Sequence, residues 1–218
     1  AKGNTMKLYS YWRSSAAYRV RIALNLKQLS FETIPVHLLK DGGQQHSAQY
    51  QQLNPNQLVP TYVDGELTLN QSLAIIEYLE EMYPEPALLP EDAAAKAQVR
   101  SLALDIACDI HPLNNLRVLQ YLTGPLTLTD DQKTEWIHHW LHTGFTALEQ
   151  RLLRTSGEFC YGDSITLADV CLVPQVYNAL RFKLDTLEYP TISRLYHHCQ
   201  QLAGFALAAP EQQSDAQV

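Results

Sequence analysis

The sequence predicts two parts, a small α/β domain followed by an all-helical domain. Three observations support this prediction. Strand-like and helix-like segments alternate through residues 6–84, prolines interrupt the chain at residues 84–90, and only helical periodicity follows them. A length of 218 residues suits one large domain or two small ones, so the division is compatible with the size of the chain.

The α/β part is predicted element by element. Residues 7–12 alternate in hydrophobicity, as a strand does, and residues 15–27 carry apolar side chains at helical spacing. Residues 31–36 predict a second strand, in which Pro35 indicates a strand end or a sheet edge because proline has no N–H. Residues 61–69 predict a hairpin, since Asp64-Gly65 suits a type I′ turn, and a helix then begins at Ser72.

The second part shows helical patterns only. Apolar residues recur at helical spacing from Val99 to Ile110, and Pro112 breaks or kinks that helix. Capping boxes are predicted at Thr129 with Gln132 and at Thr166 with Asp169, the second opening a helix that Pro174 interrupts. A last helix carries Ile192, Leu195, Cys199 and Leu202.

The expected boundaries follow from these patterns. Residues 6–84 form the α/β domain, residues 85–91 the linker and residues 92–208 the helical domain. Residues 1–5 resemble an expression scar before a native start at Met6. Residues 209–218 show no periodicity and are expected to be a frayed tail.

Composition excludes several classes of protein. Hydrophobic residues make up 46% of the chain and charged residues 18%, which excludes intrinsic disorder. The net charge of −7 argues against a nucleic-acid partner, and no apolar run approaches the ~20 residues of a membrane span. The four cysteines (Cys108, Cys160, Cys171 and Cys199) form no C-x-x-C motif. We therefore expect reduced thiols and a cytoplasmic protein.

The sequence lacks complete motifs for metal binding, phosphate binding and nucleophilic serine catalysis. His138 and His142 have the i, i+4 spacing of metal ligands but lack an accompanying glutamate or cysteine ligand. A solvated helix face explains them better, and we expect no metal. Neither a glycine-rich phosphate loop nor a G-x-S-x-G nucleophile elbow is present.

Three features of the α/β part suggest a binding site. Ser14 and Ser15 stand where a strand ends and a helix begins, and the N-terminus of a helix favours an anion. An equally good interpretation makes one of these serines only a helix cap. Val59-Pro60 precedes a strand, where a cis proline would fit, and Gln71-Ser72 opens a second helix.

The combination and order of these features resemble the zeta class of glutathione transferases. The resemblance is carried by residues 14–24 (SSAAYRVRIAL), 53–60 (LNPNQLVP) and 70–79 (NQSLAIIEYL). It continues through residues 109–115 (DIHPLNN), 166–169 (TLAD), 173–176 (VPQV) and 182–185 (FKLD), and so covers the chain from Met6 to about Phe205. It implies a thioredoxin-like α/β N-terminal domain, an all-α C-terminal domain and a homodimer, with glutathione as cofactor.

The resemblance also implies residue roles. The family's reactive serine falls on Ser14, and Arg13 and Arg181 match arginines that bind substrate carboxylates in relatives that act on maleylpyruvate. The implied glutathione-binding residues, in addition to Ser14, are Ser15, Gln45, Val59, Pro60, Gln71, Ser72, His111, Asn115 and Arg117. Val59 would pair with glutathione through its backbone, Gln71 and Ser72 would hold the γ-glutamyl carboxylate, and the site would lie between the two domains.

The implied activity is the glutathione-dependent isomerisation of maleylacetoacetate to fumarylacetoacetate, a step of aromatic amino-acid catabolism. Thiolate addition to the cis double bond, rotation and elimination convert this small dicarboxylic diketo acid to its trans isomer. Ala16 departs from the family's usual Ser-Ser-Cys run, which excludes a thiol at that position. Maleylpyruvate isomerase, a general glutathione transferase or dehalogenase, and a non-catalytic glutathione-binding module remain the alternatives.

Overall fold

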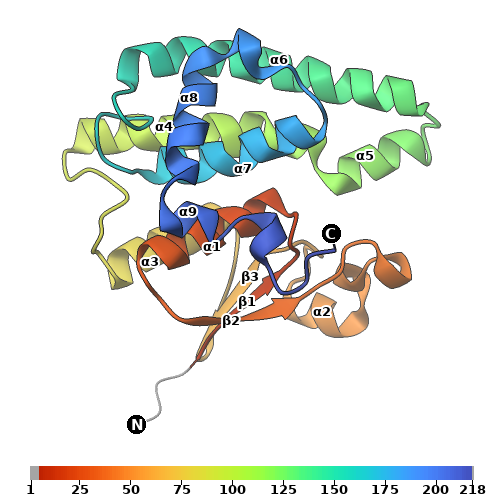
Figure 1. Ribbon diagram of the computed structural model, residues 1–218. Coiled ribbons are helices and arrows are strands. Elements are labelled where there is room, and N and C mark those ends of the chain that lie inside the picture. The colour runs from red at the N-terminus through yellow and green to blue at the C-terminus, as the bar shows by residue number, and fades with distance from the viewer. Residues whose placement is uncertain (1–4, 218) are drawn as a thin grey trace. The chain divides into compact units, whose positions relative to one another are not determined.

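The computed structural model describes residues 5–217 and divides the chain into two compact units (Figure 1). The first unit contains Ala1–Ala87 together with Leu202–Val218, and the second contains Leu88–Gln201. Residues 1–4 of the expected expression scar and residue 218 lie outside the described residues. Within residues 5–217, no helix has the length and apolar character needed to cross a bilayer.

A mixed four-stranded sheet forms the base of the first unit. Its strands are β1 (Met6–Ser10), β2 (Phe31–Pro35), β3 (Thr61–Asp64) and β4 (Leu67–Asn70), in the order β2-β1-β3-β4. β1 pairs with β2 in parallel, whereas β1–β3 and β3–β4 are antiparallel. The predicted strands are confirmed, and Pro35 ends an edge strand, where its missing N–H costs no ladder hydrogen bond.

The turn between β3 and β4 differs from the prediction. Asp64 pairs with Leu67, so Gly65 and Glu66 are the two turn residues. Gly65 has a φ of 61°, but Glu66 is not among the residues with positive φ. A type I′ turn requires positive φ at both positions, whereas type II′ requires it only at the first. The hairpin is therefore confirmed, and its turn is of type II′.

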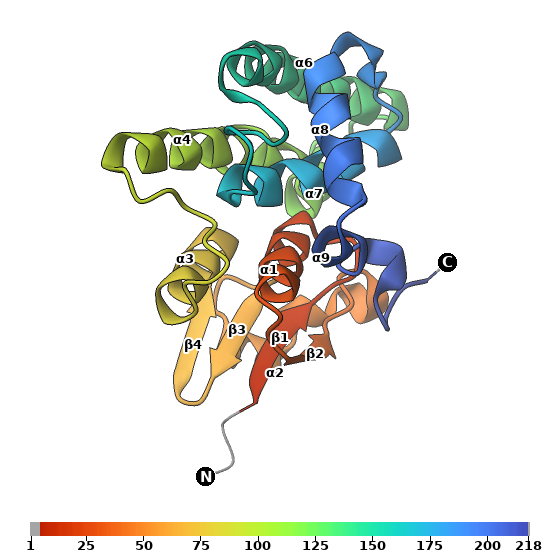
Figure 2. The same cartoon turned by 60° about the vertical axis from the view of Figure 1, so that its left-hand side comes forward.

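Helices cover both faces of the sheet. On one face lie α1 (Ser15–Leu26) and α3 (Ser72–Met82), which pack side by side (Figure 2). Leu8 and Tyr62 are fully buried against them, and the Tyr62 ring lies 6.1 Å, centroid to centroid, from the ring of Tyr78 in α3. The short helix α2 (Ala48–Leu53), which periodicity did not predict, lies on the opposite face, where Tyr50 contacts Tyr9 at a ring-centroid distance of 6.0 Å.

The C-terminal residues from Leu202 onward belong to the first unit, whereas the helical domain was expected to extend to residue 208. After α9 (Ala203–Ala206), which packs on α1, the chain forms a 3₁₀ helix at Pro210–Gln212 (Figure 1). Gly204 approaches α1 so closely that a Cβ there would meet Leu26 Cδ2 at 2.6 Å. The expectation of a frayed tail at residues 209–218 was wrong for residues 209–217, because polar contacts with distant backbone groups hold this segment and leave no periodic pattern.

Five longer helices build the second unit. They are α4 (Ala93–Asp109), α5 (Leu116–Thr123), α6 (Asp130–Thr155), α7 (Leu167–Arg181) and α8 (Pro190–Gln200). A 3₁₀ helix at His111–Asn114 follows α4, which confirms the predicted break at Pro112. Both predicted capping boxes are present, at Thr129 and Thr166. Pro174 lies inside α7 without ending it, since the surrounding turns are buried against neighbouring helices that hold them in place.

The carboxylate of Asp169 fixes the start of α7. The residue is fully buried, and its oxygens accept the N–H groups of Cys160 and Thr166, each at 2.9 Å. Burial raises the pKa of Asp169, while these hydrogen bonds partly offset that effect. Cys160, Cys171 and Cys199 are buried free thiols, and Cys108 is an exposed one, so all four carry no disulfide.

Candidate functional site

Ser14 occupies the junction between β1 and α1. It is the N-cap of α1, and its Oγ accepts the N–H of Ala17 at 3.1 Å. Its own N–H donates to the carbonyl of Tyr11 at 2.9 Å. The Ser14 O–H has no acceptor within the described part of the chain, so the cap bond leaves this donor available. Ser14 is therefore a helix cap, and its hydroxyl is also a donor that the described residues leave unused.

Arg13 and Ser15 flank this serine. The Arg13 guanidinium carbon lies 4.5 Å from the centre of the Trp12 ring, in a cation–π arrangement. Its Nε is buried and makes no hydrogen bond with the described residues. Ser15 is the first residue of α1 and is buried. A donor without an acceptor is therefore present on each of two consecutive residues, Arg13 and Ser14.

The peptide bond between Val59 and Pro60 is cis, as the sequence suggested. Two side chains of the α2 region hold the backbone before it, since Tyr50 Oη and Asn54 Nδ2 donate to the Leu58 carbonyl at 2.6 and 2.9 Å. Burial raises the pKa of Tyr50, which keeps its hydroxyl neutral. The Val59 N–H and carbonyl have no hydrogen-bond partner among residues 5–217. They can therefore pair with another extended backbone.

Gln71 and Ser72 begin helix α3. Gln71 has φ 68° and ψ 110°, a region that residues other than glycine seldom adopt and that costs of order 1–3 kcal/mol. Such strain is often concentrated at ligand sites. Ser72 is 4% exposed, and its Oγ accepts a hydrogen bond from Arg19 Nη1 at 3.2 Å. Because the first N–H groups of a helix have no partner within it, they can bind an anion here.

Gln45 lies in the connection between β2 and α2. Its side chain is almost fully buried, and Nε2 donates to the carbonyl of Leu38 at 3.2 Å. Oε1 is buried without a partner in the described residues. Gly43 makes room for this amide, since its φ is 101° and a Cβ would lie 2.7 Å from Gln45 Oε1. The turn therefore places an unused acceptor on an otherwise fixed side chain.

The first turns of α1 and α3, like those of α4 and α5, differ from the first turns of α6 and α7. They contain no acidic residue, whereas α6 has Asp130 and Asp131 and α7 has Asp169. Their N-terminal partial charge is consequently not neutralised by the helix's own carboxylates. Arg19 adds a buried guanidinium that links α1 and α3 through Ser72. The first unit thus suits a ligand with carboxylate groups and a peptide backbone.

The candidates in the second unit fall in two places. His111, Asn115 and Arg117 belong to one short stretch, the 3₁₀ helix after α4 and the start of α5. Asn115 caps α5, and its Oδ1 accepts the N–H of Leu116 at 2.9 Å, while Arg117 is exposed in the first turn. Arg181 is exposed in the last turn of α7, with its guanidinium 5.1 Å from the centre of the Phe182 ring.

Comparisons with known proteins agree with this architecture. Residues 8–87 match the model for the glutathione S-transferase N-terminal domain, and residues 119–206 match that for the C-terminal domain. A probable maleylacetoacetate isomerase of Vibrio cholerae is 59% identical over 96% of this chain and 97% of its own. A solved maleylpyruvate isomerase, described as a bacterial zeta-class glutathione S-transferase, is 45% identical with a TM-score of 0.94 and covers 97% of this chain and 100% of its own.

The chain belongs to the zeta class of the glutathione S-transferase family. A further solved relative is the maleylacetoacetate isomerase of Methylobacterium extorquens AM1, determined with bound malonate and glutathione. It is 40% identical to this chain, with a TM-score of 0.93 and coverage of 97% of this chain and 100% of its own. The likeness to these relatives therefore extends over nearly the whole molecule.

Two buried polar residues of this zeta-class transferase were not predicted from the sequence as candidate site residues. Arg19 is 3% exposed and contacts Ser72. Its signal was a charged residue four positions after Ser15 on the buried side of a helix. Asn114 is 6% exposed, and both polar atoms of its side chain lack hydrogen-bond partners among the described residues. No sequence signal separates it from Asn115, because the burial and the partners of these adjacent amides depend on the fold.

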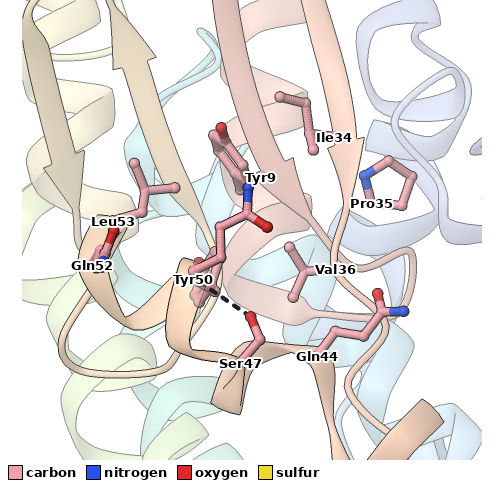
Figure 3. Close-up of a pocket in the computed structure, with 10 residues that line it drawn as sticks. Tyr9, Ile34, Pro35, Val36, Gln44, Ser47, Tyr50, Gln52 and Leu53 are labelled. Atoms are coloured by element: carbon pink, nitrogen blue, oxygen red, sulfur yellow. Dashed lines mark hydrogen bonds between the residues drawn. The ribbon is translucent and has the colours of Figure 1, made fainter.

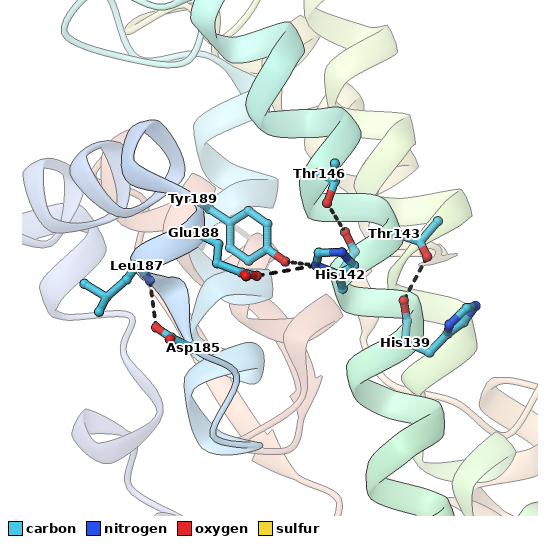
Figure 4. A network of polar contacts seen from close by, with 8 residues as sticks. All are labelled: His139, His142, Thr143, Thr146, Asp185, Leu187, Glu188 and Tyr189. Atoms are coloured by element: carbon cyan, nitrogen blue, oxygen red, sulfur yellow. Dashed lines mark hydrogen bonds and ion pairs between the residues drawn. The ribbon is translucent and has the colours of Figure 1, made fainter.

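The paired histidines of α6 have partners of their own. His138 Nε2 lies 2.6 Å from the Phe182 carbonyl oxygen. His142 Nδ1 contacts the hydroxyl of Tyr189 at 2.5 Å and the carboxylate of Glu188 at 3.6 Å (Figure 4). Within the described residues, no group of three or more His, Cys, Asp or Glu side chains is arranged to hold a metal ion. These contacts give both histidines roles in linking α6 to the segment after α7.

A pocket of about 650 Å³ lies in the first unit of this zeta-class transferase, apart from the candidate site residues. It is bordered by β1, β2 and α2, with Tyr9, Pro35, Tyr50 and Leu53 among its lining residues (Figure 3). None of the described residues that line it belongs to the predicted site. Its link to the site is indirect, since Tyr50 also donates to Leu58 beside the cis peptide bond.

Proposed function

We propose that the protein is an enzyme that isomerises maleylacetoacetate to fumarylacetoacetate with glutathione as cofactor. The observation that carries the proposal is the hydroxyl of Ser14, which is fixed at the N-terminus of α1 and has no acceptor among the described residues. Relatives of this chain that bear the same activity in their names match it over nearly its full length.

The hydrogen-bonding groups that lack partners in the first unit match the polar groups of glutathione. An unpaired backbone N–H and carbonyl at Val59 can bind the cysteinyl backbone of a peptide, with Pro60 setting the local chain direction. The α3 N-terminus at Gln71 and Ser72 suits the γ-glutamyl carboxylate, and the free Oε1 of Gln45 can accept an N–H. When bound, glutathione supplies the thiolate that adds to the cis double bond, which allows rotation before the same thiolate leaves.

Ser14 stabilises the ionised sulfur in this proposal. A thiol with a reference pKa of ~8.5 is only a few per cent ionised at neutral pH. Lowering that pKa by about two units requires roughly 2.7 kcal/mol of preferential stabilisation of the anion. The Ser14 O–H and the unpaired N–H groups of the first turn of α1, beginning at Ser15, can donate to it. The serine therefore acts as a hydrogen-bond donor, while the nucleophile belongs to the cofactor.

Arginines bind the substrate carboxylates in the proposed site. Arg13 offers a buried Nε–H with no partner among the described residues, and Arg181 offers an exposed guanidinium at the end of α7. Guanidinium groups match carboxylates geometrically and remain charged, so they also stabilise negative charge that develops on the substrate. The resemblance to the zeta class also implies glutathione contacts by His111, Asn115 and Arg117, which belong to the second unit.

One assay tests the function. The protein is incubated with glutathione and maleylacetoacetate, the trans product is followed by NMR, and free thiol is titrated before and after. Net isomerisation with unchanged thiol supports the proposal. Consumption of glutathione in proportion to product would indicate a conjugating or dehalogenating transferase. Glutathione binding without turnover would indicate a binding module.

Maleylpyruvate is the second candidate substrate. It is supported by the likeness to the solved maleylpyruvate isomerase, which is 45% identical to this chain and covers 97% of it. Measuring kcat/KM for both substrates with the same preparation separates the two, and a higher value for maleylpyruvate would replace maleylacetoacetate as the assignment.

We further propose a homodimer located in the cytoplasm. Four free cysteines without disulfides support a reducing compartment. Light scattering coupled to gel filtration tests the dimer, for which a mass of twice the 24.7 kDa chain is expected.

A further inference from the structure

The C-terminal segment, residues 207–217, is bonded to the loop that carries the proposed catalytic serine. The N–H of Trp12 donates to Asp215 Oδ2 at 3.1 Å, across 203 positions in sequence. We propose that Asp215 is a positioning residue for Ser14, acting through the backbone of residues 11–14, which we call the Ser14 loop. The proposal rests on the role of Ser14 in the proposed function.

The side chain of Arg21 also binds the backbone of Tyr11 and Trp12. Its side chain is fully buried, and Nη2 donates to the Trp12 carbonyl at 2.9 Å while Nη1 reaches the Tyr11 carbonyl at 3.4 Å. Its Nε donates to the carbonyl of Ala208 at 3.1 Å. The Trp12 residue therefore has its N–H bound by Asp215 and its carbonyl bound by Arg21, and Arg21 itself also binds the C-terminal segment.

The C-terminal segment is folded so that Asp215 faces the Ser14 loop. Gln213 Nε2 donates to the carbonyls of Leu207 and Ala209 at 3.0 and 2.9 Å, which closes the chain into a compact turn. The N–H of Ala216 donates to the Gln213 carbonyl at 3.1 Å, and Ala216 packs against the apolar cluster that contains Trp12. Asp215 lies within this turn, so its carboxylate is presented to Trp12 by a fixed backbone.

The position of Ser14 depends on this loop. Its N–H bonds to the Tyr11 carbonyl at 2.9 Å, the same carbonyl that Arg21 approaches. Trp12 is 5% exposed, so loss of the carboxylate would leave a buried N–H without an acceptor, and the loop must move to satisfy it. A shift of the Ser14 Oγ would weaken thiolate stabilisation more than it weakens glutathione binding, because Gln45, Val59 and Ser72 do not belong to the loop.

The test compares three variants of the full chain. Asp215→Ala removes the acceptor, and Asp215→Asn keeps an acceptor oxygen without the charge. Ser214→Ala is the matched control, because Ser214 is the exposed neighbour and makes no hydrogen bond among the described residues. For Asp215→Ala we expect kcat to fall roughly 10- to 100-fold, as for misplacement of a catalytic group by about 1 Å, with the KM for glutathione changed by less than about threefold.

Two further measurements report on the hydrogen bond itself. Amide hydrogen exchange at Trp12, followed by NMR, should accelerate in Asp215→Ala and remain slow in Asp215→Asn. The pKa of bound glutathione, obtained from the pH dependence of thiolate absorbance, should rise in Asp215→Ala and recover in Asp215→Asn. Both measurements can be made without turnover, so they remain informative if the substrate is a different one.

The outcomes separate this proposal from the proposed function. If the wild-type protein isomerises the substrate but Asp215→Ala behaves like Ser214→Ala, Asp215 does not position Ser14. An Asp215→Asn variant as impaired as Asp215→Ala would likewise overturn the hydrogen-bond assignment, and it provides the test if the alanine variant does not fold. Absence of isomerisation in the wild type would refute the proposed function, whereas unchanged Trp12 exchange in Asp215→Ala would refute the positioning contact.

Discussion

Replacing Ser14 with alanine tests the central chemical assignment. The substitution removes two interactions, the cap bond to the Ala17 N–H and the donor that we assign to the thiolate. Loss of an N-cap costs about 1 kcal/mol of folding stability. A hydrogen bond to a charged group contributes about 1.5–3 kcal/mol, which corresponds to an increase of about one to two units in the pKa of bound glutathione. At neutral pH we therefore expect kcat to fall roughly 10- to 100-fold.

The assay is a pH profile of kcat, with the Kd for glutathione measured separately by calorimetry. The rate of Ser14→Ala should recover as the pH rises through the increased pKa, and glutathione affinity should change much less than kcat. Thr129→Ala is the matched control, because Thr129 caps α6 in the same manner and has no assigned catalytic role. Equal turnover in Ser14→Ala and wild type, or equal losses in Ser14→Ala and Thr129→Ala, would refute the reasoning.

Three other predictions concern separate parts of the molecule. Gly43→Ala should raise the Kd for glutathione, because the new Cβ would displace the Gln45 amide. Gly42→Ala is the control, since Gly42 also has a positive φ but a Cβ there would meet no atom within 4 Å, and its Kd should be nearly unchanged. Calorimetry on both variants measures the two Kd values. Arg181→Ala should raise the substrate KM through loss of a carboxylate contact, and an unchanged KM in steady-state kinetics removes Arg181 from that role. Asp169→Asn should lower the free energy of unfolding by about 1–3 kcal/mol, because both carboxylate oxygens accept N–H groups and an amide offers only one acceptor. Burial raises the pKa of Asp169 in the folded state above the ordinary value of 3.8, so between the unfolded-state and folded-state pKa values the folded protein binds more protons than the unfolded chain. The stability of the wild type relative to Asp169→Asn should therefore increase as the pH falls through that range. Denaturant titrations at several pH values test this, and a stability difference that stays constant or shrinks would contradict it.

Local patterns predicted much of the secondary structure. Alternation and helical spacing identified β1, β2, α1 and α3, and the capping residues identified the starts of α6 and α7. These features depend on neighbours three or four positions away, which the sequence displays directly. The short helices α2, α5 and α9 were missed because a few turns provide too little periodicity to distinguish them from loops.

The candidate site was predictable only in its residue types and order. The serines, the Val59-Pro60 pair and Gln71-Ser72 were visible in the sequence and supported the resemblance to the zeta class. The sequence could not show that Gln45 has an unpartnered oxygen, that Gln71 has a positive φ or that Arg19 contacts Ser72. Each of these depends on burial or on backbone geometry set by residues distant in the chain.

The sequence by itself determined the order of the strands and of the longer helices other than α5, the family and the residues from which a site could be built. Tertiary structure alone decided which polar atoms are left without partners and where the last residues of the chain lie. Asp215 illustrates the difference, since a polar residue in an aperiodic tail bonds to Trp12 across 203 positions. The physical reason is that a hydrogen bond between distant segments depends on how the whole unit packs, and that packing leaves no local pattern in the sequence.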